Sequence, residues 1–250
     1  YIGGELHSVV KNKDEIDVRL AFCFPDTYEI GMSNIGMRIL YGVMNEMPGV
    51  WCERVFAPWG DMEQAMRENA IPLYTLENIV FAGGVCAVNP EPLADFIDFF
   101  SLGEGEESTV EIVSCYQTAK KAGWSKAEFL KAVSRIEGVY VPSFYEHTYH
   151  EDGALAAITP LDGAPERVTK RIMQDMDRAY WPEKQIVPST EIVHDRANLE
   201  VFRGCIRGCR FCQAGFCYRP VRSKHADVLY EQAVQALEDS GSSEITMASL

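Results

Sequence analysis

Long apolar runs are missing from this chain of 250 residues. No stretch reaches the roughly 18 apolar residues that a helix needs to cross a bilayer. The opening sequence, YIGGELHSVVKNKDE, also has no apolar core of the kind found in a secretory leader. We therefore expect no membrane segment and predict a cytoplasmic protein.

Positive charge is also scarce. The chain has 23 Lys and Arg residues against 37 Asp and Glu residues, a formal net charge of -14. Proteins that hold nucleic acid along an extended surface usually present a basic face, so no such surface is expected here. Basic residues do gather at positions 203–224, where an anionic ligand and a solvated loop are equally open interpretations: Arg203, Arg207, Arg210, Arg219, Arg222 and Lys224.

The order of apolar and polar segments predicts an α/β protein. Short apolar strands at residues 17–24 (DVRLAFCF) and 79–84 (IVFAGG) alternate with helical spacing at residues 33–46 and 59–69. A further helix is expected to begin at Asn89 and Pro90. Ser125 and Glu128 have the spacing of a capping box, and the pair Asp152-Gly153 predicts a hairpin turn.

Three regions follow from this order. Residues 1–107 are expected to form a doubly wound α/β domain, and residues 108–197 a helical and β-hairpin bridging segment. Residues 198–250 read as a strand, a cysteine loop, a helix and a strand, which is one βαβ unit cut off at Leu250. The front sheet has no turn residues after Asn78, where a doubly wound sheet would hold another strand and helix, so we expect a missing internal segment there.

Eight cysteines in a chain that is neither small nor visibly secreted indicate metal binding rather than disulfides. Cys205, Cys209 and Cys212 have the spacing C-x3-C-x2-C, which lets three thiolates of one tight loop bind three irons of a cubane cluster and leaves the fourth iron open. Thiolates favour both iron–sulfur clusters and zinc. A closed zinc site would need a fourth ligand, for which the candidates are Cys217, His194 and His225.

This cysteine loop follows a strand and has the aromatic Phe211 directly before its last cysteine. In these features it resembles the radical S-adenosylmethionine (SAM) superfamily, whose barrel would begin at residue 198. The resemblance implies an enzyme with a [4Fe–4S] cluster on Cys205, Cys209 and Cys212, which cleaves SAM to a 5′-deoxyadenosyl radical. It further implies Phe211 beside the adenine, an electron donor such as flavodoxin or ferredoxin, and an arginine, Arg219 or Arg222, near the SAM carboxylate. The substrate is not readable.

Most of the chain also resembles one uncharacterised bacterial family of radical SAM proteins with a cobalamin-binding-like domain ahead of the barrel. The motifs that carry this resemblance are FPDTYEIGMSNIG, FAGGVCAVNPEPLADFIDFFSLGEGEE, GVYVPSFY, VHDR and RGCIRGCRFCQAGFCYRPVR. It implies a cobalamin-like crevice at Tyr28, Gly31, Gly83 and Gly84, and methyl transfer as one outcome. Tyr28 stands where the cobalamin signature D-x-H-x-x-G has its histidine, so three readings stay open: cobalamin without a protein ligand, another ligand, or lost binding.

Two rival functions remain. Cys23, Cys52 and Cys86 lie near strand ends and could hold a second cluster, as in methylthiotransferases. Alternatively, the chain is a non-catalytic binding protein stabilised by zinc at the cysteine loop.

Four further residues have plainer interpretations. We predict that Cys217 is a packed side chain and that His147 and His150 are surface residues. We also predict that His194, with its neighbour Asp195, ties the linker to the first barrel strand.

Overall fold

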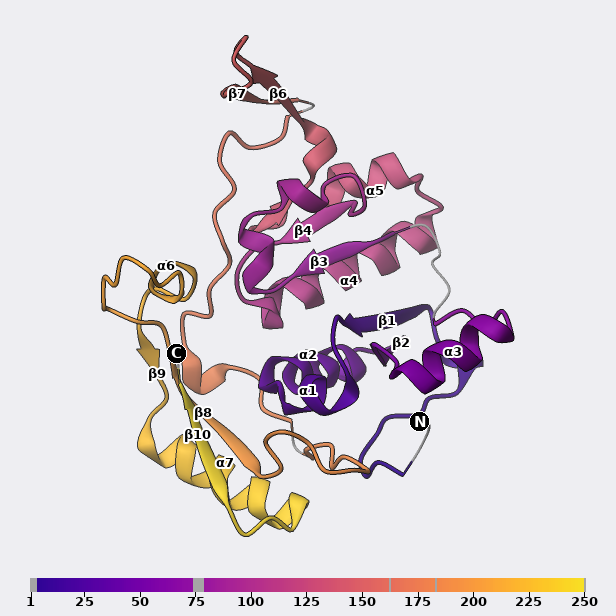
Figure 1. Cartoon of the computed structure of the whole chain (residues 1–250), viewed down its shortest axis with the longest axis vertical. Coiled ribbons are helices and arrows are strands. Elements are labelled where there is room, and N and C mark those ends of the chain that lie inside the picture. The colour runs from indigo at the N-terminus through magenta and orange to yellow at the C-terminus, as the bar shows by residue number, and fades with distance from the viewer. Residues whose placement is uncertain (1–3, 74–78, 162, 183, 250) are drawn as a thin grey trace. The chain divides into compact units, whose positions relative to one another are not determined.

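The structure is a computed structural model that describes residues 4–73, 79–161, 163–182 and 184–249 (Figure 1). Helices and strands alternate through most of it, so the α/β class predicted from the sequence is confirmed. The chain divides into two compact units. The first combines Tyr1–Thr75 with Gln174–Leu250, and the second is Leu76–Met173. The predicted missing segment after Asn78 falls at residues 74–78, outside the described residues.

The first unit contains two small sheets, of which the N-terminal one is a parallel pair. Strand β1 (Val18–Phe24) runs beside β2 (Val50–Phe56), with Val18 opposite Val50 and Phe24 opposite Phe56. Helices α1 (Tyr28–Ser33) and α2 (Ile35–Glu46) connect the two strands, and α3 (Gly60–Glu68) follows β2. The Asn34 side chain caps α2 by accepting a hydrogen bond from the Met37 amide, so α2 begins where its sequence predicts.

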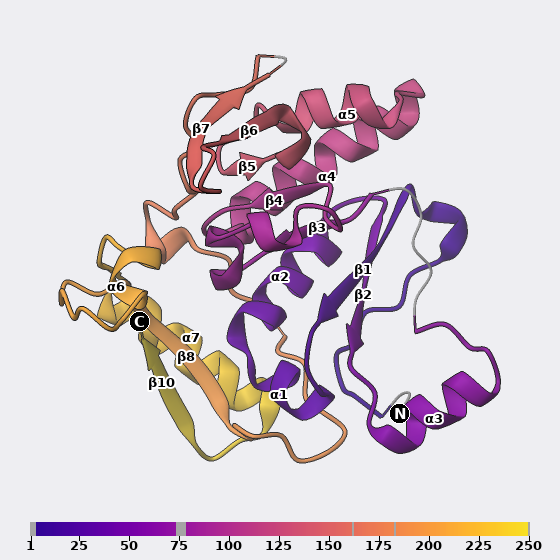
Figure 2. The same cartoon turned by 45° about the horizontal axis from the view of Figure 1, so that its top comes forward.

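The other sheet of the first unit carries the cysteine loop. Strand β8 (Ala197–Arg203) lies between the parallel β10 (Ile245–Ser249) and the short antiparallel β9 (Arg222–Ser223). Helix α6 (Ala214–Cys217) belongs to the connection between β8 and β9, and α7 (Ala226–Ser240) connects β9 to β10. Figures 1 and 2 both show α7 lying along β8 and β10. These elements form an open βαβ arrangement, and the described residues contain no closed barrel.

The second unit is built on a three-stranded sheet. Strand β4 (Phe99–Ser101) pairs in parallel with β3 (Phe81–Gly83) and antiparallel with β5 (Val139–Tyr140). Short 3₁₀ turns, η2 (Val85–Val88) and η3 (Glu91–Leu93), lie between β3 and β4. Helices α4 (Gly105–Ala122) and α5 (Lys126–Val133) follow β4, and a hairpin of β6 (Tyr145–Tyr149) and β7 (Leu155–Pro160) follows β5.

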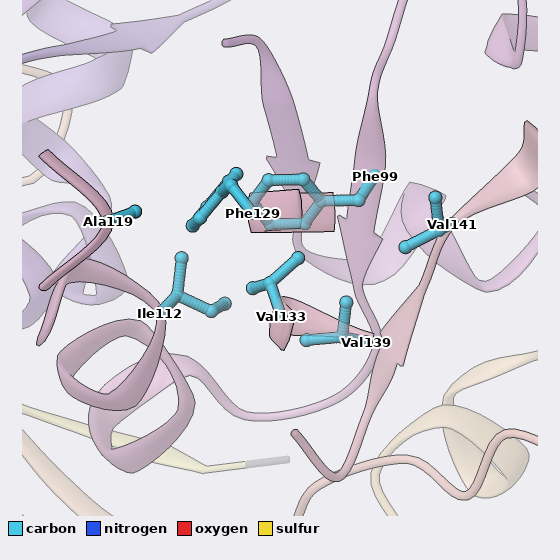
Figure 3. Packing of buried hydrophobic residues seen from close by; sticks show 7 residues of the cluster. All are labelled: Phe99, Ile112, Ala119, Phe129, Val133, Val139 and Val141. Carbon is cyan, nitrogen blue, oxygen red and sulfur yellow. The ribbon is translucent and has the colours of Figure 1, made fainter. Parts of the chain in front are cut away.

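The core of the second unit lies where α4 and α5 meet this sheet. Phe99 of β4 is fully buried and stacks on Phe81 of β3 with ring centroids 5.0 Å apart. Phe129 of α5 meets Phe99 edge-on. Figure 3 shows how the side chains converge; the buried members are Phe99, Ile112, Ala119, Phe129, Val133, Val139 and Val141.

Most elements predicted from local patterns are confirmed, including the strand at residues 17–24, the helix at 33–46, the capping box at Ser125 and the hairpin turn at Asp152. The helix predicted to begin at Asn89 is wrong. Residues 91–93 form only a 3₁₀ turn, and the following Phe99 and Phe100 are buried in a strand. The tertiary pairing of β4 with β3 overrides the helical spacing of this segment.

The front of the chain does not form one continuous sheet in the described residues. Strands β1 and β2 form one sheet, and β3, β4 and β5 form another. The domain boundaries at residues 107 and 197 stay predictions. None of the helices in the described ranges combines the length and apolar character needed to cross a membrane.

Candidate functional site

The cysteine loop begins directly after β8, at a glycine. Any other residue at this position would force the neighbouring backbone to move. Gly204 has a φ of +100°, and a Cβ placed on it would lie 2.3 Å from the carbonyl oxygen of Pro220. The start of the loop is therefore held against the segment that leads into β9. A positive φ together with this close approach explains why the sequence has glycine at this position.

A second glycine lets α6 lie close to the loop between Cys205 and Cys209. Gly215 lies in α6, and a Cβ there would be 2.9 Å from the carbonyl oxygen of Arg207. Between these two contacts, the amide of Cys212 donates a hydrogen bond of 3.1 Å to the carbonyl oxygen of Cys209. The loop that carries the three cysteines is thus folded back onto α6 by its own backbone.

The three thiols are free and reachable from solvent. Cys209 is exposed, Cys205 and Cys212 are partly exposed, and none forms a disulfide. Across the described ranges, no three His, Cys, Asp or Glu side chains converge into a group that could hold a metal ion. The donor set nevertheless fits an iron–sulfur cluster in its chemistry, because three accessible thiols within eight residues are the soft ligands that iron–sulfur clusters take.

Of the three residues suggested as a fourth zinc ligand, His225 has its side chain paired with another residue, and the other two are held through their backbones. The ring of His225 pairs with Asp177, and the backbone of His194 donates to the Ser33 hydroxyl over 3.0 Å. Cys217 is half-buried at the end of α6, where its amide donates to the Gln213 carbonyl oxygen. The pairing with Asp177 speaks against His225 as a zinc ligand.

The side chains predicted to meet SAM lie around the same loop. Phe211 projects into solvent with 93% of its surface exposed, so a ring is present and uncovered at the predicted position. The Arg219 guanidinium lies over the ring of Phe216, 5.6 Å from its centroid. Arg222 donates to the carbonyl oxygens of Pro220 and Tyr218 over 3.1 Å and 3.3 Å. Arg222 thus holds the chain after α6, and the SAM contacts of all three residues stay predictions.

Tyr28, which stands where a cobalamin signature has histidine, takes part in a polar network inside the first unit. Its hydroxyl donates a hydrogen bond of 2.7 Å to Glu5 Oε1, and the other carboxylate oxygen of Glu5 pairs with Arg54 over 2.6 Å. Burial and the hydrogen bond to Glu5 raise the pKa of Tyr28 to about 12. The hydroxyl therefore stays neutral and occupied, which makes it a poor ligand for a metal.

The glycines of the predicted crevice have separate roles. Gly31 is buried in α1, and a Cβ there would lie 2.3 Å from the Phe56 ring, so this glycine allows helix–strand packing. Gly83 ends β3, and the following Gly84 has a φ of +89° with open space where a Cβ would point. Gly31 belongs to the first unit, whereas Gly83 and Gly84 belong to the second.

The acidic turn at residues 103–107, which ends the motif FAGGVCAVNPEPLADFIDFFSLGEGEE, contacts the chain itself. The amide of Glu104 donates to the Arg171 carbonyl oxygen over 2.9 Å, and the Arg171 guanidinium pairs with Glu107 and Glu111. Gly103 has a φ of +103° and touches the Arg171 backbone, where a Cβ would come within 2.1 Å. The turn therefore anchors residues 171–173, a role that the sequence did not indicate.

A cluster at β5 and β6 also escaped prediction. His147 has only 18% of its side chain exposed, and its Nε2 lies 3.4 Å from Glu91 Oε2. The Tyr140 hydroxyl donates to the other oxygen of Glu91. His147 is thus half-buried beside Glu91 of η3, a contact that the hairpin pattern could not show, whereas His150 is exposed as predicted.

The first domain offers little support for a second cluster. Cys52 is fully buried in β2, and burial raises its pKa to about 12, which disfavours the thiolate that a cluster needs. Cys23 is exposed on β1, and Cys86 is exposed in the second unit.

Comparison with known proteins matches a segment that lies ahead of the cysteine loop in the sequence. The model of a family described as "Radical SAM proteins, N-terminal" matches residues 36–79 and 77–142. This match supports membership of the radical SAM superfamily. It is also 30% identical over 167 residues to an uncharacterized protein of Methanocaldococcus jannaschii, an alignment that covers 64% of this chain. The chain spans 29% of the length of that relative. No solved structure matches the present chain.

Proposed function

We propose that this chain contains the cluster-binding segment of a radical SAM enzyme, with Cys205, Cys209 and Cys212 as the three ligands of a [4Fe–4S] cluster. The observation that carries the proposal is the loop between β8 and β9, which presents three free and accessible thiols in the spacing C-x3-C-x2-C. The match of residues 36–142 to a radical SAM N-terminal family supports it independently.

The residues of the chain would position and shield this site. Gly204 and Gly215 let the loop lie close to the backbone of α6 and residues 218–220, and Arg222 fixes that second segment through its carbonyl oxygens. Phe211 offers an uncovered ring for stacking on a base. When bound, the cluster would supply one electron to the sulfonium of SAM, giving methionine and a 5′-deoxyadenosyl radical, which would become 5′-deoxyadenosine by taking a hydrogen atom from the substrate. A flavodoxin or ferredoxin would deliver that electron.

The test is reductive SAM cleavage by the anaerobically reconstituted full-length protein. We expect 5′-deoxyadenosine to form with dithionite, and Cys205→Ala, Cys209→Ala and Cys212→Ala each to abolish it. Cys217→Ala is the matched control, because it removes a neighbouring thiol outside the motif and should retain the activity. Formation of 5′-deoxyadenosine by the three motif variants would contradict the proposal.

Assistance by cobalamin in methyl transfer is the finer part of the proposal. Because the Tyr28 hydroxyl is held by Glu5, the corrinoid would bind without a ligand from Tyr28. The open space at Gly84 would allow a nucleotide tail to approach the backbone. Retention of hydroxocobalamin after desalting, unchanged in Tyr28→Phe, is the expected result. Loss of the corrinoid spectrum from the wild-type protein would contradict the role of cobalamin and leave the proposal of a [4Fe–4S] cluster unaffected.

A further inference from the structure

The second unit contains a cavity of about 490 Å³ that is separate from the cysteine loop. Its lining comes from two stretches of chain, residues 131–139 at the end of α5 and residues 163–169 after the hairpin. Cavities of this size are typical of small-molecule sites. The chemistry of the lining therefore decides which ligand it suits.

The first stretch is fixed by its backbone. The amide of Arg135 donates to the Ala132 carbonyl oxygen over 3.2 Å, and the Ile136 amide donates to the Val133 carbonyl oxygen over 3.0 Å. Val139 follows in β5 and is 2% exposed within the core shown in Figure 3. This side of the cavity is therefore rigid before any ligand arrives.

The second stretch is anchored by two contacts. The Tyr145 hydroxyl donates a hydrogen bond of 2.9 Å to the Pro165 carbonyl oxygen. Val168 packs against the buried cluster of Ala87, Phe100 and Tyr140. Residues 165 and 168 thus hold Arg167 between them in a defined position.

Three cationic residues, all of them exposed, are among those that line the cavity. Lys131, Arg135 and Arg167 make no ion pair or side-chain hydrogen bond within the described ranges of the chain. The lining carboxylate of Glu137 lies 3.7 Å from the Arg171 guanidinium, so that cation already offsets its charge. Three such positive charges around one hollow are unusual in a chain with a formal net charge of -14.

The dipole of α5 explains only part of this arrangement. Cations near a helix C-terminus are favourable, which accounts for Lys131 in the last turn and Arg135 just beyond it. Arg167 lies on a non-helical segment and gains nothing from the dipole. Its presence in the same cavity points to an anion that all three side chains share.

We propose that this cavity binds the phosphate groups of a small phosphorylated molecule. The planar guanidinium groups of Arg135 and Arg167 match phosphate oxygens in pairs, and Lys131 adds a point charge. Ser134 and Thr169 also line the cavity, and the Ser134 hydroxyl donates a hydrogen bond of 3.1 Å to the Lys131 carbonyl oxygen. No aromatic ring is among the described lining residues, so the site offers no stacking surface for a nucleobase.

Isothermal titration of the full chain with pyrophosphate and with ADP tests this proposal. We expect one saturable site for pyrophosphate and no tighter binding of ADP, because the base finds no ring to stack on. The double variant Arg135→Gln/Arg167→Gln should weaken binding by about tenfold or more, because it removes both guanidinium groups that pair with phosphate oxygens. Lys13→Gln, which removes an exposed cation of the other unit, is the matched control.

A wild-type chain without saturable binding of either probe would overturn the proposal, and so would a double variant that binds as well as Lys13→Gln. Tighter binding of ADP that depends on both arginines would keep the site and assign it to a nucleotide. Phenylglyoxal labelling gives a readout on the unmutated protein. Pyrophosphate should protect Arg135 and Arg167 from the reagent, and equal labelling with and without it would contradict the proposal.

Discussion

Gly215 lies so close to the carbonyl oxygen of Arg207 that a Cβ on this glycine would come within 2.9 Å of it. The contact joins α6 to the middle of the cysteine loop, between Cys205 and Cys209. Because the neighbouring atom is backbone rather than the end of a side chain, the loop would have to move to admit a methyl group.

Gly215→Ala should therefore impair cluster loading without removing a ligand. Forcing the loop away from α6 costs about 1–3 kcal/mol, which is enough to lower cluster incorporation several-fold. Iron content after anaerobic reconstitution measures the effect. Gly208→Ala is the matched control, because Gly208 lies in the same loop and a methyl group there would have no atom within 4 Å. Equal iron content in both variants would show that the α6 contact does not position the loop.

Tyr28→Phe should destabilise the first unit while leaving the cysteine loop intact. The substitution removes a hydrogen bond to Glu5, a carboxylate that is mostly buried against Arg54. Loss of a hydrogen bond to a charged group lowers the free energy of unfolding by about 1.5–3 kcal/mol. Urea denaturation measures it, with Tyr149→Phe at an exposed hairpin position as the control. Equal midpoints would mean that the Glu5 contact contributes nothing.

Gly103→Ala should be more damaging than Gly123→Ala, although both glycines have positive φ. Gly123 caps α4 at a φ of +68° in open space, so alanine there costs only the backbone strain of about 1–2 kcal/mol. At Gly103, the methyl group would also meet the Arg171 backbone, which raises the expected loss above about 3 kcal/mol. Thermal unfolding of the two variants compares them directly. Similar losses would contradict the docking of residue 171 on the acidic turn.

His225 and Asp177 should make stability depend on pH. Hydrogen bonding to Asp177 and its charge raise the pKa of His225 above 6.5, and hydrogen bonds from the His225 backbone and ring lower the pKa of Asp177 below 3.8. The pair therefore makes its full contribution to folding stability between about pH 3.8 and pH 6.5, the ordinary pKa values of the two side chains. The contribution is lost as pH rises through the folded pKa of His225, or falls through that of Asp177.

His225→Ala should accordingly lower the Tm more at about pH 5.5 than at about pH 8.5. Thermal denaturation across this range measures the difference, and His150→Ala, at another exposed histidine, is the control. A Tm difference that stays constant with pH would rule out the His225–Asp177 pair as a source of stability.

The sequence predicted features whose causes are local. The capping box of Ser125 and Glu128 satisfies backbone groups three residues apart, and the turn at Asp152 needs only its own short-range geometry. The cysteine loop belongs to the same class, because its ligands lie within eight residues of one another.

Features that depend on distant partners could not be predicted. The acidic turn is anchored by Arg171, more than sixty residues further along the chain than Glu107. Tyr28 was interpreted from a signature, whereas its environment is set by Glu5 and Arg54. The phosphate cavity requires Arg135 and Arg167 to meet across an intervening hairpin. No spacing rule links residues of this kind.

The central claim, that Cys205, Cys209 and Cys212 hold an open [4Fe–4S] cluster, is tested most directly by elemental analysis. The chain is reconstituted without oxygen, desalted, and assayed for iron, zinc and acid-labile sulfide, alone and with each motif cysteine changed to alanine. We predict four irons and four sulfides per chain, lost in each motif variant and retained in Cys217→Ala. One zinc per chain with no sulfide would contradict the account.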